Sequence, residues 1–250
     1  VTPPAIYLCP TGNAGFDLRC GSTHMDALVE QVRRGGYRLG IAFDGDGDRC
    51  LLVDEQGQVV DGDAIMLVLA QHLKRRGALR GDTLVATVMS NIGLEIALRR
   101  EGIDMLRTPV GDKHVAGAIA TGNYALGGEQ SGHVILSDFL FTGDGIVTAL
   151  SVLRVMADTG RTLAELTVGY TRFPQVLLNH RVARRVPVEE VPAVAAAMRA
   201  VEQRLAGEGR LLVRYSGTEP LLRVMIEGKD QSQIHAWAEE IVAAARAALS

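Results

Sequence analysis

The sequence predicts an α/β protein, in which a domain with a mixed or mostly parallel sheet is followed by a smaller α+β domain. Helical and strand patterns alternate along residues 59–171, and this order is typical of βαβ units. From residue 172 onward the order changes to strand, helix, two strands and helix, which indicates a separate α+β fold. An acidic, glycine-rich loop between two apolar segments precedes both parts.

The earliest clear strand patterns flank that loop. The apolar segments are YRLGIAF at residues 37–43 and CLLVD at residues 50–54. Both are short, bounded by turn residues and rich in large apolar side chains, as strands are. We therefore expect the loop to be held at both ends by strands.

Residues 59–171 are predicted to alternate between helix and strand. Apolar residues recur at helical spacing in segments 63–76, 91–102, 112–122 and 143–160, and strand patterns occupy 83–90 and 104–110. Basic residues end the first of these helices, and a glycine ends the second. The alternation predicts that most of the strands run parallel.

The C-terminal part is predicted to be smaller and of different order. Its elements are a strand at 173–182, a helix at 191–207, a strand, loop and strand at 210–228, and a helix at 231–249. Alanine is frequent in both helices, which its high helix propensity explains. We expect residues 172–250 to form this α+β domain.

The composition excludes several classes of partner. Of 250 residues, 47% are hydrophobic and 22% are charged, and the net charge is -3, as in an ordinary globular protein. No run of Lys and Arg favours nucleic acid, and no apolar run approaches the roughly 18 residues of a transmembrane helix. We therefore expect neither nucleic acid nor a membrane as a partner, whereas local arginines can bind small anionic ligands.

The cysteines predict a reducing compartment. Cys9, Cys20 and Cys50 are three in number and lack CxxC spacing, which argues against a disulfide framework. We expect a cytoplasmic protein, in which Cys50 belongs to the core of a strand and is not a metal ligand.

The acidic loop is a candidate metal site. Asp44, Asp46 and Asp48 alternate with glycines directly after the first predicted strand. Two unit charges about 4 Å apart repel by roughly 4 kcal/mol at an effective dielectric of about 20, so a partly buried triplet needs a cation. The glycines let the loop curl until the carboxylates converge. Hard oxygen ligands of this kind select Mg²⁺, Mn²⁺ or Ca²⁺.

Two other interpretations of this loop stay open. Counted from Asp44, the acidic positions also match a calcium-binding EF-hand loop that ends at Glu55. Its sixth position is Arg49, where the turn requires glycine, and its flanks resemble strands where an EF-hand has helices. A solvated acidic turn between two strands is the simpler alternative.

A second polar motif is LGGEQSGHVIL at residues 126–136. Glu129, Ser131 and His133 occupy alternate positions, which would place them on one side of the chain if the segment is extended. Such a trio can hold the hydroxyl groups of a sugar. A polar hairpin edge explains the same pattern without a ligand.

A third motif is VRYSGTEPLLRV at residues 213–224, in which Arg214, Ser216 and Thr218 alternate around Gly217. A guanidinium can bind phosphate through two parallel hydrogen bonds, and the hydroxyls and the N–H groups near a glycine add donors. The motif therefore predicts a phosphate cradle. The solvent face of a strand would show the same alternation.

Together, FDGDGDR, GGEQSGH and RYSGTEPLLRVMIEG, in this order and at these separations, resemble the metal-, sugar- and phosphate-binding loops of the α-D-phosphohexomutase superfamily. The resemblance covers nearly the whole chain from Cys20 onward. Gln130, CGSTH and SGTEPLLRVM are similar to the bacterial phosphoglucosamine mutase branch. Phosphomannomutase/phosphoglucomutase enzymes commonly carry methionine in place of Gln130.

This resemblance implies an isomerase that interconverts glucosamine 6-phosphate and glucosamine 1-phosphate through a phosphoserine and a bisphosphorylated sugar. It implies Mg²⁺ as the cofactor, held by Asp44, Asp46 and Asp48. The implied catalytic residues are Arg49 and His133. The implied substrate-binding residues are Lys113, Glu129, Ser131, Arg214, Ser216, Gly217, Thr218 and Arg223.

The chain also departs from the family pattern. The family's catalytic serine lies in a motif like ASHNP, and these 250 residues contain no such motif. Where the family has GDRYV, this chain has GDKHV, so that Lys113 keeps the positive charge.

We therefore expect the C-terminal portion of a longer protein. Residues 1–58 would be the tail of the second family domain with the metal loop, 59–171 the third domain with the sugar loop, and 172–250 the C-terminal domain with the phosphate loop. This portion alone is expected to be inactive, and a homodimer is an expected arrangement of the full-length form. The alternatives are a phosphomannomutase/phosphoglucomutase and a non-catalytic phosphosugar-binding fragment.

Overall fold

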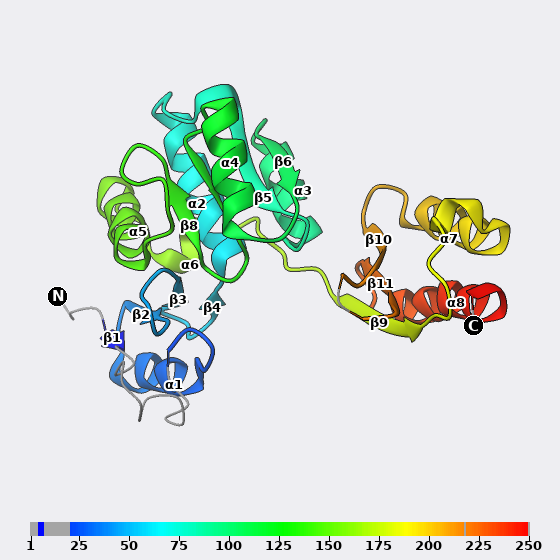
Figure 1. Cartoon of the computed structure of the whole chain (residues 1–250). Coiled ribbons are helices and arrows are strands. Elements are labelled where there is room, and N and C mark those ends of the chain that lie inside the picture. Colours follow the sequence, from blue (N-terminus) through cyan, green and yellow to red (C-terminus); the bar gives the residue numbers. More distant parts are fainter. Residues whose placement is uncertain (1–4, 8–20, 218, 250) are drawn as a thin grey trace. The chain divides into compact units, whose positions relative to one another are not determined.

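The structure is a computed structural model that describes residues 5–7, 21–217 and 219–249. It divides into two compact units, Val1–Thr171 and Arg172–Ser250, both drawn in Figure 1. The predicted combination of an α/β part and a smaller α+β part is confirmed. No helix in the described ranges is long and apolar enough to cross a membrane.

Among the described residues, the first unit contains two four-stranded sheets. The first sheet has the order β1 (Ala5–Tyr7), β2 (Leu39–Phe43), β3 (Cys50–Asp54) and β4 (Val59–Val60). Strands β2 and β3 pair antiparallel, and Phe43 opposite Cys50 is the pair nearest the acidic loop. The acidic loop therefore connects the two strands of a β-hairpin, as the apolar segments on either side of it predict.

Helix α1 (Asp26–Gly35) packs against this first sheet. Its buried residues Leu28 and Val32 form a cluster with Ala42 of β2 and Val53 of β3. The acidic loop thus extends from a sheet that a helix supports.

The second sheet has the strand order β6–β5–β7–β8 and is mixed. Strand β5 runs parallel to β6 and β7, and β7 pairs antiparallel with β8. The strands are β5 (Thr83–Thr87), β6 (Asp104–Thr108), β7 (Leu126–Gly128) and β8 (Val134–Leu136). The helices are α2 (Gly62–Arg75), α3 (Ile92–Arg100), α4 (Asp112–Gly122), α5 (Gly145–Thr159) and α6 (Leu163–Leu166), with a short 3-10 turn, η2, at Arg80–Asp82.

Helix α2 joins the two sheets into one core. Every residue from Gly62 to Ala70 is buried, and the cluster around the helix includes Leu52 of the first sheet and Leu126 of the second. The helix begins where the side chain of Asp61 accepts a hydrogen bond from the N–H of Ala64 (3.1 Å), which satisfies a donor that the helix itself leaves free. The hairpin with the acidic loop and the mixed sheet therefore share their buried interior.

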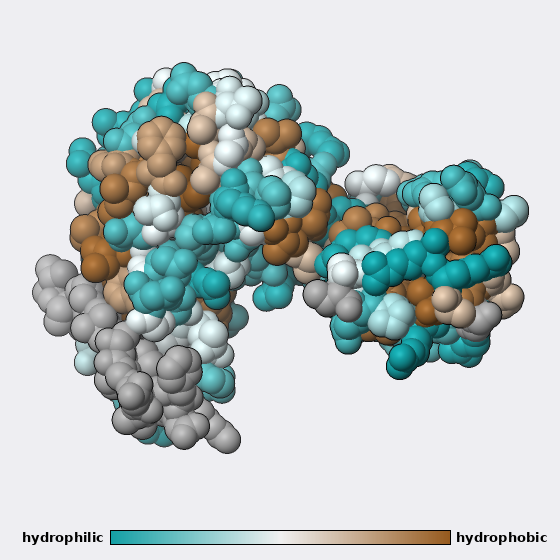
Figure 2. All heavy atoms as spheres, viewed as in Figure 1, coloured by the Kyte–Doolittle hydropathy of each residue, from teal (hydrophilic) through white to brown (hydrophobic). Residues whose placement is uncertain are grey.

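Exposed apolar area in the first unit gathers on one side. Among the nine exposed large apolar residues described in this unit, five fall in the loop after β8 and on α5: Phe139, Leu140, Phe141, Ile146 and Leu150. Figure 2 shows apolar surface in the region where Figure 1 places α5. A groove of about 660 Å³ lies there, between α2, the end of β8 and α5. This apolar area does not include the acidic loop.

The second unit is a three-stranded antiparallel sheet with the order β10–β11–β9. Its elements are β9 (Gln175–Arg181), the short 3-10 turn η3 (Val188–Glu190), α7 (Pro192–Leu205), β10 (Arg210–Tyr215), β11 (Leu221–Glu227) and α8 (Gln231–Leu249). Val194 of α7, Val224 of β11 and Ile234 of α8 belong to one buried cluster. The second unit therefore has a core of its own.

Candidate functional site

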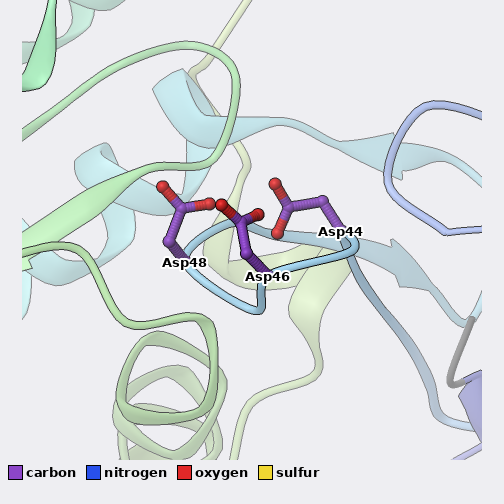
Figure 3. Close-up of side chains that lie close together, drawn as sticks. All are labelled: Asp44, Asp46 and Asp48. Carbon is purple, nitrogen blue, oxygen red and sulfur yellow. The ribbon is translucent and has the colours of Figure 1, made fainter. Parts of the chain in front are cut away.

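The acidic loop brings three carboxylates together. One oxygen from each of Asp44, Asp46 and Asp48 lies within 4.8 Å of the other two, and Figure 3 shows the three side chains on the same side of the loop. Gly47 has a φ of 76°, a left-handed conformation that glycine adopts at little cost. The predicted convergence between two strands is confirmed, and metal binding stays a prediction.

Arg49 lies against this cluster. Its backbone N–H donates to Asp44 Oδ1 (3.1 Å), and its Nε lies 3.6 Å from Asp44 Oδ2 and 3.8 Å from Asp48 Oδ1. Partial burial raises the pKa of Asp44, and Asp48 and Asp46 add to the shift although the N–H of Arg49 opposes it. Burial and the neighbouring carboxylates therefore disfavour the charged form of Asp44 although Arg49 lies beside it.

His133 connects the acidic loop to the second sheet. Its Nδ1 lies 2.8 Å from Asp48 Oδ2, and the N–H of Gly143 donates to its Nε2 (3.2 Å). Because Nε2 accepts a hydrogen bond, the proton of the neutral ring is assigned to Nδ1, which donates to Asp48. Burial by itself would raise the pKa of Asp48, but the hydrogen bond that His133 donates and the nearby charge of Arg49 lower it overall. The buried histidine therefore keeps Asp48 ionised and oriented.

Gly143 and Gly145 support the same site, and neither was singled out from the sequence. A Cβ on Gly143 would lie 2.5 Å from the ring of His133, and one on Gly145 would lie 2.7 Å from the carbonyl oxygen of Arg49. The N–H of Gly145 also donates to the carbonyl oxygen of Gly47 (2.9 Å). Only glycine lets the start of α5 approach the acidic loop this closely. The GDG sequence at the start of the predicted helix is the pattern from which both could have been found.

The sugar motif forms a tight turn and is not extended. Between β7 and β8, the N–H of Glu129 donates to the carbonyl of His133 (2.9 Å), and the N–H of Gly132 donates to the carbonyl of Glu129 (3.0 Å). The extended conformation that would place three side chains on one side is therefore not formed. His133 faces Asp48, whereas Ser131 Oγ donates to Glu129 Oε2 (3.4 Å). The turn thus separates the histidine from the pair formed by Glu129 and Ser131.

The N-terminus of α4 contacts this turn. The N–H of Gly111 donates to Glu129 Oε1 (3.0 Å), and Lys113 is exposed in the first turn of the same helix. Glu129 is therefore held from two directions, by Gly111 and by Ser131. Lys113 is placed at the end of α4 that faces this turn.

The phosphate motif lies between β10 and β11 of the second unit. Arg214 stands opposite Arg223 in the antiparallel pair, so the two side chains project from the same face of the sheet. Arg223 Nη2 lies 3.5 Å from Glu219 Oε2, while its Nε is buried and has no hydrogen-bond partner among the described residues. Two guanidinium groups therefore share this part of the sheet face.

The hydroxyl residues of this motif differ in their surroundings. Ser216 is buried, and its Oγ accepts a hydrogen bond from the N–H of Glu219 (3.4 Å). Gly217 is exposed, and Thr218 lies outside the described residues. The structure thus places Arg214 at the end of β10, Ser216 in the connection that follows and Arg223 near the start of β11.

Cys50 belongs to the core of β3, as predicted. Its side chain is fully buried beside the acidic loop, and burial raises the pKa of its thiol to about 12. A protonated thiol is a poor ligand and a poor nucleophile. The other two cysteines, Cys9 and Cys20, lie outside the described residues.

Two family models match most of the chain. The alpha/beta/alpha domain III of phosphoglucomutase/phosphomannomutase matches residues 61–173, and the C-terminal domain of the same family matches residues 177–244. The chain belongs to the phosphoglucomutase/phosphomannomutase family. Both the sugar turn and the phosphate loop lie inside the matched regions of this family.

Curated members of the phosphoglucomutase/phosphomannomutase family are similar in sequence. A phosphoglucosamine mutase of Syntrophotalea carbinolica is 51% identical over 92% of this chain and 49% of that protein. A phosphoglucosamine mutase of Symbiobacterium thermophilum is 50% identical over 98% of this chain and 55% of that protein. The chain therefore spans about half the length of the curated relatives it matches.

Solved structures of sugar-phosphate mutases share the fold. A family protein from Burkholderia thailandensis matches with a TM-score of 0.70 at 20% identity, over 90% of this chain and 50% of that one. N-acetylphosphoglucosamine mutase of Aspergillus fumigatus, in complex with GlcNAc-6P and magnesium, matches with a TM-score of 0.68 at 23% identity, over 93% of this chain and 54% of that one. At these identities the likeness concerns the fold alone.

Proposed function

We propose that this chain is part of a phosphoglucosamine mutase, an isomerase that interconverts glucosamine 6-phosphate and glucosamine 1-phosphate. The observation that carries the proposal is the convergent aspartate cluster backed by His133, in a chain of this family. An identity of about one half to bacterial phosphoglucosamine mutases supports the amino sugar as the substrate class. The reaction would proceed through a phosphoserine and a bisphosphorylated sugar, and it would serve the synthesis of amino-sugar nucleotides and cell-wall precursors in the cytoplasm.

The aspartate cluster fits a magnesium ion as the cofactor. Asp44, Asp46 and Asp48 offer the hard oxygen ligands that Mg²⁺ prefers. Asp48 Oδ1 is buried and receives no hydrogen bond from the described residues, although Nε of Arg49 lies 3.8 Å away. Burial and the neighbouring carboxylates raise the pKa of Asp44. When bound, Mg²⁺ would supply a Lewis acid that offsets the charge of a phosphoryl group in transfer. His133 would keep Asp48 in place as a ligand, and Arg49 would lie beside the phosphoryl group.

The remaining motifs supply groups for the sugar and its phosphate. Glu129 and Ser131 would hold sugar hydroxyls, and Lys113 would add a positive charge near them. The proposed ligands of the non-reacting phosphate are Arg214, Ser216, Gly217, Thr218 and Arg223. We assign residues 1–58, 59–171 and 172–250 to the second, third and fourth domains of the longer enzyme.

Two other functions differ from this one at identifiable positions. A phosphomannomutase/phosphoglucomutase would differ at the sugar turn, where Gln130 favours the amino-sugar branch. A non-catalytic phosphosugar-binding fragment would need no nucleophile. The serines inside the matched loops support no nucleophilic role, because Ser216 is buried and Ser131 matches a sugar-binding position.

The test combines binding with turnover. We expect the purified chain, with Mg²⁺, to bind glucosamine 6-phosphate more tightly than glucose 6-phosphate or mannose 6-phosphate in calorimetry. With a hexose bisphosphate added, we expect no glucosamine 1-phosphate, because the 250 residues contain no motif like ASHNP and the serines of the matched loops correspond to ligand-binding positions. Turnover above a metal-free control would place the nucleophile within these residues, and tighter binding of mannose phosphate would favour the sibling mutase.

Arg214→Ala is expected to weaken the binding of the sugar phosphate by about 1.5 to 3 kcal/mol, the usual value of a hydrogen bond to a charged group. Arg214 and Arg223 project from the same face of the sheet, so Arg223 stays in place when Arg214 is replaced. We expect the second unit of this variant to fold. Calorimetric titration with glucosamine 6-phosphate measures the change. Arg199→Ala, an exposed arginine of α7, is the matched control, and an equal effect of both variants would count against the cradle.

A further inference from the structure

Gln130 lies within the sugar turn, but its side chain points into the protein. Its Nε2 lies 3.2 Å from Asp63 Oδ2, and Asp63 is fully buried. The amide nitrogen is assigned to this side because a carboxylate only accepts hydrogen bonds. The residue that distinguishes the amino-sugar branch in sequence is therefore engaged with a buried carboxylate.

Asp63 connects three segments, namely helix α2, the start of α3 and the sugar turn. It lies in the first turn of α2, and its Oδ2 also accepts a hydrogen bond from the backbone N–H of Asn91 (2.8 Å), the residue that caps α3. Both hydrogen bonds end on the same oxygen of a carboxyl group that is fully buried. Gln130 is thus attached to a fixed point inside the first unit.

The backbone of the turn is held at the same place. The N–H of Gly62 donates to the carbonyl of Gln130 (3.0 Å), and the N–H of Cys50 donates to the carbonyl of Gly132 (3.1 Å). A Cβ on Gly62 would meet the carbonyl oxygen of Gln130 at 2.9 Å and the nitrogen of Gly132 at 2.7 Å. The turn therefore packs directly against the start of α2, and the hydrogen bond from the Gln130 side chain to Asp63 adds a further link between them.

We propose that Gln130 is a positioning residue, which fixes Glu129 and Ser131 for the sugar through buried Asp63 and does not contact the sugar itself. This inference rests on the proposed function for the identity of the ligand. Glu129 is already bound on its other side by Gly111, so the tether completes the support of the pair. The amino-sugar branch would then differ from its siblings in how the turn is held.

Gln130→Met tests the hydrogen bond between Gln130 and Asp63, which we call the tether, because methionine has a similar length and no hydrogen-bond donor. We expect the affinities for glucosamine 6-phosphate and glucose 6-phosphate to fall together by about tenfold, with their ratio unchanged within about twofold. We also expect hydrogen exchange at the N–H groups of Gly62 and Gly132 to become about tenfold faster. Gln71→Met is the matched control, because Gln71 makes the same kind of bond to Glu101 on the surface (3.4 Å).

Three results would overturn the inference. Unchanged exchange at Gly62 and Gly132 would show that the tether does not order the turn, whatever the chain binds. If Gln130→Met lowers the affinity for glucosamine 6-phosphate and leaves that for glucose 6-phosphate unchanged, Gln130 contacts the amino group directly. If Gln130→Met still weakens binding tenfold when added to Asp63→Asn, it does not act through Asp63. Failure of the unaltered chain to bind either sugar would instead refute the proposed function, and the exchange measurement would still decide on the tether.

Discussion

Glu227→Ala is expected to lower the free energy of unfolding of the second unit by about 3 to 5 kcal/mol, which is typical when one partner of a buried ion pair is removed. The side chain of Glu227 in β11 is fully buried, and its Oε2 lies 2.9 Å from Nε of Arg210 in β10, whose side chain is 14% exposed. Without the carboxylate, the guanidinium would remain in a largely water-free position and lose this charged partner.

The sequence provides a selective probe for this measurement. Trp237 is the single tryptophan of the chain and lies on α8 in the second unit, so its fluorescence during urea denaturation follows that unit. Glu208→Ala is the control, because Glu208 and its partner Lys229 are 67% and 63% exposed and such pairs contribute less than about 1 kcal/mol. If Glu227→Ala lowers the free energy of unfolding by no more than the control does, the prediction is contradicted.

Asp46→Ala is expected to weaken Mg²⁺ or Mn²⁺ binding by about 100-fold or more. Loss of a partner that merely supports a ligand already costs about 10- to 100-fold, and Asp46 would be a direct ligand. Asp46 is exposed and lies in a loop closed by a hairpin, so the variant should fold normally. Mn²⁺ titration followed by paramagnetic resonance measures the affinity, with Mg²⁺ as competitor.

The control for this variant is Asp104→Ala, which removes an exposed aspartate from the start of β6. Affinity should also decline as the pH falls, because a protonated carboxyl is not a ligand. The raised pKa of Asp44 means that this decline begins at a higher pH than for an ordinary aspartate, whereas the lowered pKa of Asp48 delays its protonation. Equal Mn²⁺ affinity in both variants would exclude a metal site at the loop.

The sequence was sufficient where local patterns decide the structure. The apolar segments on either side of the aspartates predicted β2 and β3, and the hairpin between them forces Asp44, Asp46 and Asp48 into proximity. Helical spacing of apolar residues and the basic residues at the end of the segment likewise predicted α2 and its basic C-terminal turn. These features depend on neighbours in sequence.

The orientation of the sugar motif could not be predicted in the same way. Alternation places side chains on one side only if the chain is extended, and the turn at Glu129 reverses it instead. The pairing of His133 with Asp48 joins residues 85 positions apart, and the close approach of Gly145 to Arg49 is also long-range. Such contacts depend on how α5 and the two sheets pack, which no local pattern encodes.

The core around α2 determines which parts of this chain can be exchanged between relatives. The third-domain family model begins at residue 61, yet Leu39 and Leu52 from the preceding hairpin belong to the same buried cluster as Leu84 and Leu126. A chimaera joined at residue 61 would therefore combine two parts of one hydrophobic core that come from different parents. The second unit keeps a separate interior, so a junction near Thr171 leaves both interiors whole. A hybrid enzyme that takes its acidic loop from one parent should take helix α2 from the same parent.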